Sequence, residues 1–538
     1  MQPMLRLTEI ILPLDHSEAD LAAAVAARLA PAVPSRFTIA RRAIDARRKS
    51  AIKLTYTIDA ETEGEPEILA RNHPHIRPTP DTTYKPPAIR PASTRPASTR
   101  PIVIGTGPCG LFAALILAQA GLRPIILERG KPVRQRTKDT WAFWRRGILT
   151  PESNVQFGEG GAGTFSDGKL YSQISDPNHL GREVLTEFVA AGAPAEILTV
   201  AHPHIGTFRL VGMVETMRET IERLGGEYRF GARVTGLILD SVPRRARGVI
   251  LDSGETLTAD HIILAIGHSA RDTFEMLRDA GVHLDPKPFS IGFRIEHPQS
   301  MIDRARYGSF AGNPLLGAAD YKLVHHAKNG RSVYSFCMCP GGTVVAAASE
   351  PGRVVTNGMS QYSRNERNAN AGIVVGITPA DYPDADKGDI LAGMAFQRHL
   401  ESSAYVQGGS TYHAPGQLVG DFLAARPSTS LGTVIPSYKP GVHLTDLAPC
   451  LPDYAIEAIR EAIPHFARKI PGFDRADALL TGVETRTSAP IRITRDASGQ
   501  SLNTPGLFPA GEGAGYAGGI LSAGVDGIRA AEAVMRAG

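Results

Sequence analysis

The sequence contains little cysteine, little net charge and no uninterrupted apolar run of membrane-spanning length. Its 538 residues include four cysteines, Cys109, Cys337, Cys339 and Cys450. They are too few and too scattered to cross-link a secreted scaffold, so a reducing compartment is expected. No second cysteine pair or close histidine pair completes a zinc site, so we expect no metal. A net charge of +4 is too small to indicate nucleic acid binding by the whole chain.

Targeting and membrane signals are also missing. The first 20 residues, MQPMLRLTEIILPLDHSEAD, lack the basic segment and long apolar run of a signal peptide. The most apolar stretch, residues 102–127, contains four glycines, two prolines and Arg123, a combination that a lipid-spanning helix rarely has. With 42% apolar and 21% charged residues, we expect a folded, multidomain, cytoplasmic protein that does not contact a membrane.

The first 60 residues predict a small βαββ module, residues 1–60. Strands are expected at residues 4–12, 36–44 and 51–58, and an alanine-rich helix at residues 17–29. The last two strands flank the basic segment RRAIDARRK, residues 41–49. This segment is either a patch for an anion, nucleic acid or partner or a solvated strand edge and turn, and we favour the second interpretation.

Residues 61–100 are polar and rich in proline, and they end in PASTRPASTR, a five-residue unit written twice. Proline and serine at this density favour an extended, semi-rigid spacer. We therefore predict a linker and a domain boundary here.

A dinucleotide-binding fingerprint follows the linker. In PIVIGTGPCGLFAALILAQAGLRPIILERG, a strand at residues 102–104 leads into Gly105, Gly107 and Gly110, then an apolar helix and a second strand that ends at Glu128. The glycines permit the tight turn, the approach of backbone to a pyrophosphate and close helix packing. Glu128 is placed to accept hydrogen bonds from an adenosine ribose. Cys109 within the turn is either a thiol of lowered pKa or, as we favour, a small buried filler.

The carboxyl-terminal segment distinguishes FAD from NAD. TPGLFPAGEGAGYAGGILSAGVDGIRAAEAVM resembles the second flavin motif of the glutathione-reductase-like FAD fold, with Glu512 where that motif has aspartate. The resemblance implies that this acid lies at the ribityl chain and that the helix amino terminus faces the isoalloxazine, where it stabilises reduced flavin. HIILAIG, ending at Gly267, and Val234 in GARVTGLIL resemble the middle motif and the adenine contact of the same fold. The chain has no second complete fingerprint, so NAD(P)H would bind transiently or not at all.

Residues 154–175, NVQFGEGGAGTFSDGKLYSQIS, concentrate glycine. Gly163 and Gly168-Lys169 nearly match a phosphate loop, but Leu170 stands where magnesium binding needs serine or threonine. Interleaved apolar residues also argue against a linker. We predict a loop that packs beside the flavin, with Gly160, Gly161 and Gly163 at the ring and Ser166, Asp167 and Lys169 as polar contacts.

Several segments together resemble a known group, the FAD-dependent proteins usually described as uncharacterised NAD(FAD)-utilising dehydrogenases. The segments are VQFGEGGAGTFSDGKL, GHSARDTFEMLRDAGV, KPFSIGFRIEHPQ, CMCPGGTVVAAASEPG, TNGMSQYSRNERNANAGIVV, ETRTSAPIRI and AGEGAGYAGGILSAG. They extend over most of the chain from Pro101. The resemblance implies an FAD-dependent dehydrogenase that includes the amino-terminal module, and it implies no substrate.

The expected fold is α/β: a Rossmann-like FAD-binding domain of the glutathione-reductase type, with an inserted, mainly antiparallel β substrate domain and the βαββ module. We place the FAD-binding domain at residues 101–287 and 482–538 and the substrate domain at residues 288–481. In the latter, RSVYSFCMC and GGTVVAAAS predict a hairpin joined through Pro340-Gly341-Gly342. The predicted cofactor-binding residues are Gly105, Gly107, Pro108, Gly110, Glu128, Arg129, Gly160, Gly161, Gly163, Ser166, Asp167, Val234, Gly267, Gly511, Glu512, Gly518, Gly519 and Ile520.

Candidate catalytic residues are Lys169, Cys337 and Cys339. Residues two apart on a strand share a face, so Cys337 and Cys339 are either a redox-active or substrate-reactive thiol pair or, as we favour, part of a buried face. Three arginines, Arg294, Arg364 and Arg486, are candidates for binding an acidic substrate or for structural ion pairs. We assign no histidine as a general base.

Three functions compete. The leading hypothesis is an FAD-dependent oxidoreductase that moves a hydride between a small organic substrate and flavin N5. The second is an RNA-modifying flavoprotein that presents nucleic acid through the RRAIDARRK module. The third is a flavin-bound scaffold or sensor without turnover.

Overall fold

The computed structural model describes residues 4–88, 100–383 and 387–537. The predicted PASTR repeat lies outside the described residues, apart from its last residue, Arg100. Within the described ranges, no helix is both long and apolar enough to cross a membrane. The architecture is α/β, with one parallel sheet and several antiparallel sheets.

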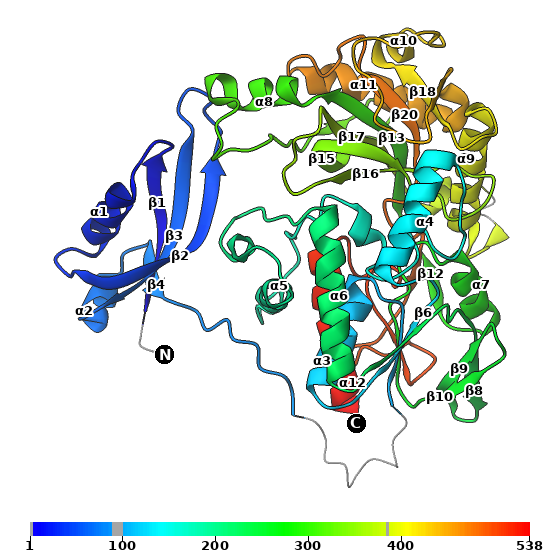
Figure 1. The fold of residues 1–538 in the computed structure, drawn as a ribbon, viewed down its shortest axis with the longest axis horizontal. Helices are drawn as coiled ribbons and strands as arrows, with labels where there is room; N and C mark the ends of the chain where they lie inside the picture. Colours follow the sequence, from blue (N-terminus) through cyan, green and yellow to red (C-terminus); the bar gives the residue numbers. More distant parts are fainter. Residues whose placement is uncertain (1–3, 89–99, 384–386, 538) are drawn as a thin grey trace.

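The amino-terminal module is an antiparallel sheet of order β2-β3-β1-β4, and a helix, α1, lies beside it (Figure 1). The predicted βαββ elements are confirmed as β1 (Leu5–Pro13), α1 (Glu18–Leu29), β2 (Pro34–Asp45) and β3 (Lys53–Thr62). Ser17 caps α1 in a capping box with Asp20, which satisfies otherwise unpaired amides. Leu21, Val25 and Leu29 bury the apolar stripe of the helix.

Two further elements lie where the sequence predicts only linker. A short helix, α2 (Glu65–Ala70), begins after Gly64, which has a left-handed φ of 74°. The strand β4 (Ile76–Pro78) pairs with the edge of β1. Part of the segment predicted as a spacer is therefore ordered as far as Pro78, because the open edge of β1 offers backbone partners to the chain that follows.

The second sheet is parallel and has the order β22-β11-β5-β6-β7. Its strands are β5 (Ile102–Ile104), β6 (Ile125–Glu128), β7 (Glu227–Phe230), β11 (Ile262–Leu264) and β22 (Leu507–Pro509). The interior strands β5 and β11 are fully buried and consist only of apolar residues, as expected when both faces of a sheet are covered. The predicted strand–helix–strand unit at residues 102–128 and the predicted carboxyl-terminal strand are confirmed.

Helices cover this sheet. Figure 1 shows α3 (Pro108–Gln119), α6 (Thr207–Arg223) and α12 (Ile520–Ala537) lying side by side. In α3, ten of twelve residues are buried, which explains the apolar stretch that could be mistaken for a membrane segment. Two further helices, α4 (Val133–Arg146) and α5 (Leu180–Ala190), precede α6.

An antiparallel sheet of order β10-β9-β8 adjoins the parallel sheet. It consists of β8 (Val234–Ser241), β9 (Arg244–Leu251) and β10 (Thr256–Thr258), and α7 (Arg271–Asp279) follows β11. A two-stranded pair, β12 (Leu284–Pro286) with β21 (Ile491–Ile493), joins the two ends of the inserted region.

The inserted region is built on a large sheet of order β14-β15-β17-β13-β20-β18-β19, in which β16 pairs with β15. Its strands are β13 (Phe289–Pro298), β14 (Val324–His326), β15 (Ser332–Ala346), β16 (Thr356–Ser360), β17 (Asn368–Ile377), β18 (Ala414–Leu418), β19 (Val442–Leu444) and β20 (Leu479–Glu484). Its helices are α8 (Gln299–Tyr307), α9 (Ala392–Gln407), α10 (Val419–Leu423) and α11 (Asp453–Ala467). We call this region the cap.

The predicted hairpin through Pro340-Gly341-Gly342 is wrong. Residues 332–346 form one strand, β15, whose register against β17 shifts between Phe336 and Cys339 and again before Gly342. Gly341 has φ 42° and a Cβ there would lie 1.7 Å from the carbonyl oxygen of Arg364, so the glycine permits a close backbone approach. The extra residues are absorbed as bulges, and the strand then pairs with β16.

Candidate active site

A cavity of about 390 Å³ lies where the parallel sheet meets the cap. Ile104, Glu128, Ala265 and Ala510 line it from the carboxyl ends of β5, β6, β11 and β22, or just after them. Ligands of open α/β sheets bind at this edge, and the volume is within the usual range for small-molecule sites. The cap contributes Phe336, Cys337 and Asn357 from β15 and β16.

Most of the predicted site residues border this one cavity. Those that line it are Gly105, Gly107, Pro108, Glu128, Arg129, Gly161, Gly163, Ser166, Asp167, Lys169, Val234, Gly267, Cys337, Gly511, Glu512, Gly518, Gly519 and Ile520. Gly110, Gly160 and Cys339 lie behind the wall and are not among the lining residues.

The fingerprint turn has the geometry that its glycines predict. Gly105 has φ 95°, and a Cβ there would lie 2.4 Å from the carbonyl oxygen of Ala265. A Cβ on Gly110 would lie 1.9 Å from the carbonyl oxygen of Gly105. Gly107 caps α3 without a side chain, so the first-turn amides of the helix face the cavity. The helix packs tightly and presents its positive end to any anion there.

The carboxylate of Glu128 organises the chain around this turn. One oxygen accepts hydrogen bonds from the backbone amide and the hydroxyl of Thr106, at 3.0 and 2.5 Å. The other accepts from the amides of Gly130 and Gly158, at 2.8 and 3.0 Å. The side chain is buried. Glu128 therefore ties the fingerprint turn to the glycine-rich loop, in addition to the ribose contact predicted for it.

Arg129, also predicted at the site, is fixed by two carboxylates. It donates to Glu152 at 2.7 Å and to Asp272 at 2.8 Å, and its guanidinium lies 4.1 Å from the centre of the Phe157 ring. The guanidinium of Arg129 is thus held in one position at the edge of the cavity.

The glycine-rich loop is folded around a buried arginine. Arg136 of α4 donates to the carbonyl oxygens of Asn154, Val155 and Glu159 at 2.7–2.8 Å. Burial lowers its pKa to about 10. Five donors in a planar fork can satisfy three carbonyls at once, which explains how an irregular segment stays ordered. The Arg136 guanidinium therefore holds the glycine-rich loop in place.

Gly161 of this loop touches the fingerprint turn. Its φ is 63°, and a Cβ there would lie 2.6 Å from the Cα of Gly107. The two glycine segments therefore meet backbone to backbone at the cavity wall, which no larger residue would allow.

The carboxyl-terminal turn closes another wall. A Cβ on Gly267, Gly518 or Gly519 would meet no protein atom within 4 Å, so these backbones border open space. Glu512 accepts a hydrogen bond from the amide of Gly519, just before α12 begins at Ile520. A second helix amino terminus thus faces the cavity.

Cys109 is a buried residue under this turn. Burial raises its pKa well above the ordinary thiol value, and a Cβ on Gly511 would lie 2.8 Å from the Cβ of Cys109. These observations agree with the filler role rather than with an activated thiol.

Lys169 and Asp167 stand at the cap side of the cavity. The ammonium of Lys169 lies 2.7 Å from Asp167 Oδ2 and also donates to the carbonyl oxygen of Met338. Arg364 donates to both oxygens of Asp167. Burial acts to raise the pKa of Asp167, but Lys169 and Arg364 outweigh it and hold the pKa below the usual range. Asp167 is therefore an anion that orients two cations.

Cys337 and Cys339 have different environments. Cys337 is half-buried, lines the cavity and has φ 41°, whereas Cys339 is fully buried. Arg294 donates to the carbonyl oxygen of Cys337 at 2.9 Å and pairs with Glu484 at 2.8 Å. The bulge therefore turns one thiol toward the cavity and leaves the other in the protein interior.

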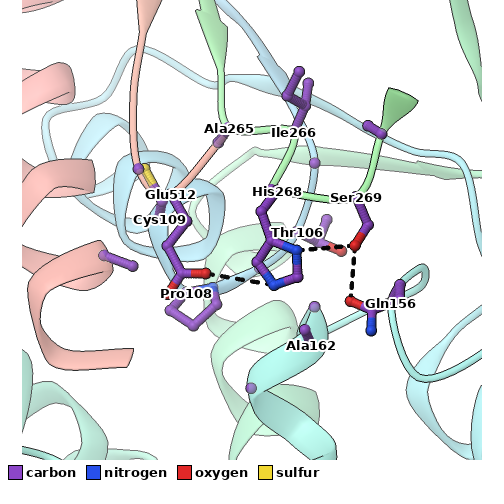
Figure 2. A pocket seen from close by; sticks show the side chains of 18 of the residues that line it. Thr106, Pro108, Cys109, Gln156, Ala162, Ala265, Ile266, His268, Ser269 and Glu512 are labelled. Atoms are coloured by element: carbon purple, nitrogen blue, oxygen red, sulfur yellow. Dashed lines mark hydrogen bonds and ion pairs between the residues drawn. The ribbon is translucent and has the colours of Figure 1, made fainter. Parts of the chain in front are cut away.

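A polar chain that the sequence did not identify crosses the cavity wall (Figure 2). His268 Nε2 lies 3.8 Å from Glu512 Oε2, and its Nδ1 lies 2.9 Å from the hydroxyl of Ser269. Ser269 in turn donates to Gln156 at 3.1 Å. Burial lowers the pKa of His268, which favours the neutral ring. The sequence signal that could have identified His268 is its position directly after Gly267, which was itself predicted to border the cofactor.

A buried ionic network joins the cap to the parallel-sheet region. Glu401 of α9 accepts from Arg271 of α7 at 2.7 Å and from Arg486 at 3.1 Å. Arg486 also donates to Ser349 and lines the cavity. Arg294, Arg364 and Arg486, the three candidate arginines for an acidic substrate, all make such structural pairs.

The RRAIDARRK segment lies on β2 and the following turn, and none of its residues is among those lining the cavity. Arg47 pairs with Asp45 at 2.6 Å. Arg42 exchanges backbone hydrogen bonds with residues 199 and 201, which anchors this edge strand to the rest of the chain.

Two family models match separate parts of the chain, one in the cap region and one in the amino-terminal module. A family model described as "FAD-dependent protein, C-terminal domain-like" matches residues 288–487. A domain of unknown function matches residues 4–61. An uncharacterised protein of Clostridium beijerinckii is 48% identical over 507 residues, which is 93% of this chain and 92% of that protein.

Solved structures resemble the chain more distantly. A geranylgeranyl bacteriochlorophyll reductase-like protein from Thermoplasma acidophilum is 13% identical over 82% of this chain and 78% of its own, with a TM-score of 0.35. A 3-ketosteroid-Δ4-(5α)-dehydrogenase from Rhodococcus jostii is 13% identical over 84% of this chain and 99% of its own, with a TM-score of 0.35. These similarities say nothing about the reaction of this chain.

Proposed function

The chain belongs to the FAD-dependent protein family, and from this premise we propose that it is an oxidoreductase whose cavity binds FAD. The observation that carries the proposal is the convergence of three glycine segments and two helix amino termini on one cavity. The open space beside Gly267, Gly518 and Gly519 is the room that a dinucleotide needs at its backbone contacts. The residues present therefore fit the group.

Different walls would hold different parts of FAD. The turn from Gly105 to Pro108 and the amino terminus of α3 suit the pyrophosphate. Glu128, Arg129 and Val234 would hold the adenosine end. Gly161, Gly163 and the amino terminus of α12 would hold the flavin ring, beside Ser166 and Asp167. A Rossmann-like FAD domain of the glutathione-reductase type is the fold that this assignment proposes.

When bound, FAD supplies two-electron chemistry at N5, and we propose that a hydride passes between N5 and a small organic substrate. The protein would position both partners. Lys169 can donate a hydrogen bond or electrostatic stabilisation, because its ammonium is held by Asp167 and the Met338 carbonyl. The cap lines one side of the same cavity and would limit the access of water to it.

The proposal is tested by an anaerobic screen of NADH, NADPH and pooled metabolites against the purified protein. We expect one donor to bleach the flavin absorbance band, at a rate fast enough for catalytic turnover. A protein that binds FAD but is reduced by none of these donors would favour the scaffold or sensor hypothesis.

Replacing Lys169 separates binding from chemistry. In Lys169→Ala we expect unchanged FAD content, because Arg364 still neutralises Asp167. We expect flavin reduction to slow on the order of 10²-fold, the usual contribution of one polar catalytic group. Stopped-flow reduction with the donor from the screen measures this, and the exposed lysine variant Lys322→Ala is the matched control. If Lys169→Ala is reduced at the wild-type rate, Lys169 takes no part in flavin reduction.

A further inference from the structure

Two thiols of unlike character lie at the cap wall of the cavity, and the proposed function gives them no role. Cys337 faces the cavity from the bulge in β15, and Cys339 lies behind it in the interior. The Cys339 sulfur is 3.3 Å from the carbonyl oxygen of Cys337. A positive φ at Cys337 is a strained conformation of the kind that persists at functional sites.

Two cations are anchored on the backbone between these cysteines. Lys169 donates to the carbonyl oxygen of Met338, and Arg294 donates to that of Cys337. Asp167 and Glu484 pair with them, and Arg364 pairs with Asp167. The Cys339 hydrogen bond, Lys169 and Arg294 hold the pKa of Cys337 well below the ordinary thiol value, against the effects of burial and Asp167. The Cys337 hydrogen bond and burial raise the pKa of Cys339.

We propose that Cys337 and Cys339 are an attacking and a resolving thiol that reduce a small-molecule disulfide in this cavity. The arrangement places one cavity-lining, half-buried cysteine, with Lys169 and Arg294 anchored on the adjacent backbone, in front of one fully buried cysteine, as a two-step exchange requires. The substrate is a small molecule rather than a protein, because Cys337 is half-buried in a cavity of about 390 Å³.

The exchange balances without an added oxidant. The Cys337 thiolate attacks one sulfur of the substrate disulfide, a mixed disulfide forms, and the first product leaves as a thiolate that takes up a proton. Cys339 then loses its proton, its sulfur attacks Cys337, and the second product thiol leaves with that proton. The substrate gains two electrons and the cysteine pair loses them. The inference rests on the proposed function at one point, because reduced FAD, formed by the hydride donor of that function, is the source we name for the two electrons and one proton that restore the Cys337 thiolate and the Cys339 thiol.

The test uses the purified full-length protein, freed of reductant and treated with 2-hydroxyethyl disulfide. After alkylation and digestion, we expect the peptide containing both cysteines to lose two hydrogens and to resist alkylation. Cys339→Ser should accumulate a mixed disulfide on Cys337 instead. Cys450 is a buried cap cysteine whose pKa is raised by burial to about 12, and Cys450→Ser should behave as the wild type.

A second experiment measures the rate at which Cys337 is alkylated. In Lys169→Ala, this rate at pH 7 should fall about 10-fold because the pKa of Cys337 rises, and the pH profile of alkylation should shift to higher pH.

Unmodified cysteines in the treated wild type, or a mixed disulfide as abundant there as in Cys339→Ser, would overturn the inference. Flavin content and bleaching, measured on the same preparations, keep the two proposals apart. Retained, reducible flavin without a Cys337–Cys339 bond overturns the thiol inference alone. A Cys337–Cys339 bond in protein that binds no flavin overturns the proposed function alone.

Discussion

Gly161→Val should purify without its cofactor. At this position φ is 63° and a Cβ would lie 2.6 Å from the Cα of Gly107. Neither backbone segment can retreat, because Gly160 donates to the Thr106 carbonyl at 2.9 Å and the Glu128 carboxylate ties Thr106 to Gly158. Strain and overlap at such sites cost about 1–3 kcal/mol each. The affinity for FAD should therefore fall on the order of 10²-fold or more.

Flavin absorbance per mole of protein after gel filtration measures this effect. Gly212→Val is the matched control, because Gly212 is exposed on α6 and a Cβ there meets nothing within 4 Å. Circular dichroism establishes that both variants are folded. A folded Gly161→Val protein with wild-type flavin content would show that this loop does not border the cofactor.

The second large effect is expected at Glu401, which joins the cap to the parallel-sheet region. Glu401→Ala leaves the guanidinium groups of Arg271 and Arg486 buried without their shared carboxylate. Removing one partner of a buried ionic network costs about 3–5 kcal/mol. We expect the free energy of unfolding, measured in urea, to fall by this amount. The exposed Glu457→Ala on the cap helix α11 should change it little.

The pH dependence of stability tests the same network of Glu401, Arg271 and Arg486 a second time. Burial acts to raise the pKa of Glu401, but Arg271 and Arg486 outweigh it and hold the pKa below the ordinary value of 4.5. A depressed folded-state pKa contributes stability above the unfolded value and loses it as the pH falls. The wild type should therefore lose this contribution as the pH falls below about 4.5, and Glu401→Gln should lack that part of the dependence. Parallel acid profiles of the two proteins would contradict the assignment.

Local patterns in the sequence predicted which segments meet at the parallel-sheet side of the cavity. The fingerprint glycines, Glu128 and the carboxyl-terminal turn each follow a strand, and strand ends of a parallel sheet meet at one edge. Gly161 and Lys169 were placed there because the glycine run needs a close approach and carries polar residues. All of these except Gly110 line one cavity.

The remaining features depend on contacts between distant parts of the chain. Arg136 looks like any helix-surface arginine until the loop of residues 154–159 folds over it. The bulged course of β15 depends on a backbone approach from Arg364, which no local turn signal reports. The chain from Glu512 through His268 to Gln156 joins three segments separated by more than 100 residues along the sequence.

The central claim is that this cavity binds FAD. The most direct measurement is to denature the purified protein, separate the released small molecules and identify them by absorbance and mass. We predict FAD, in an amount close to one per chain, and its loss from Gly161→Val. A wild-type protein that releases no flavin and binds none when FAD is added at micromolar concentration would contradict the account.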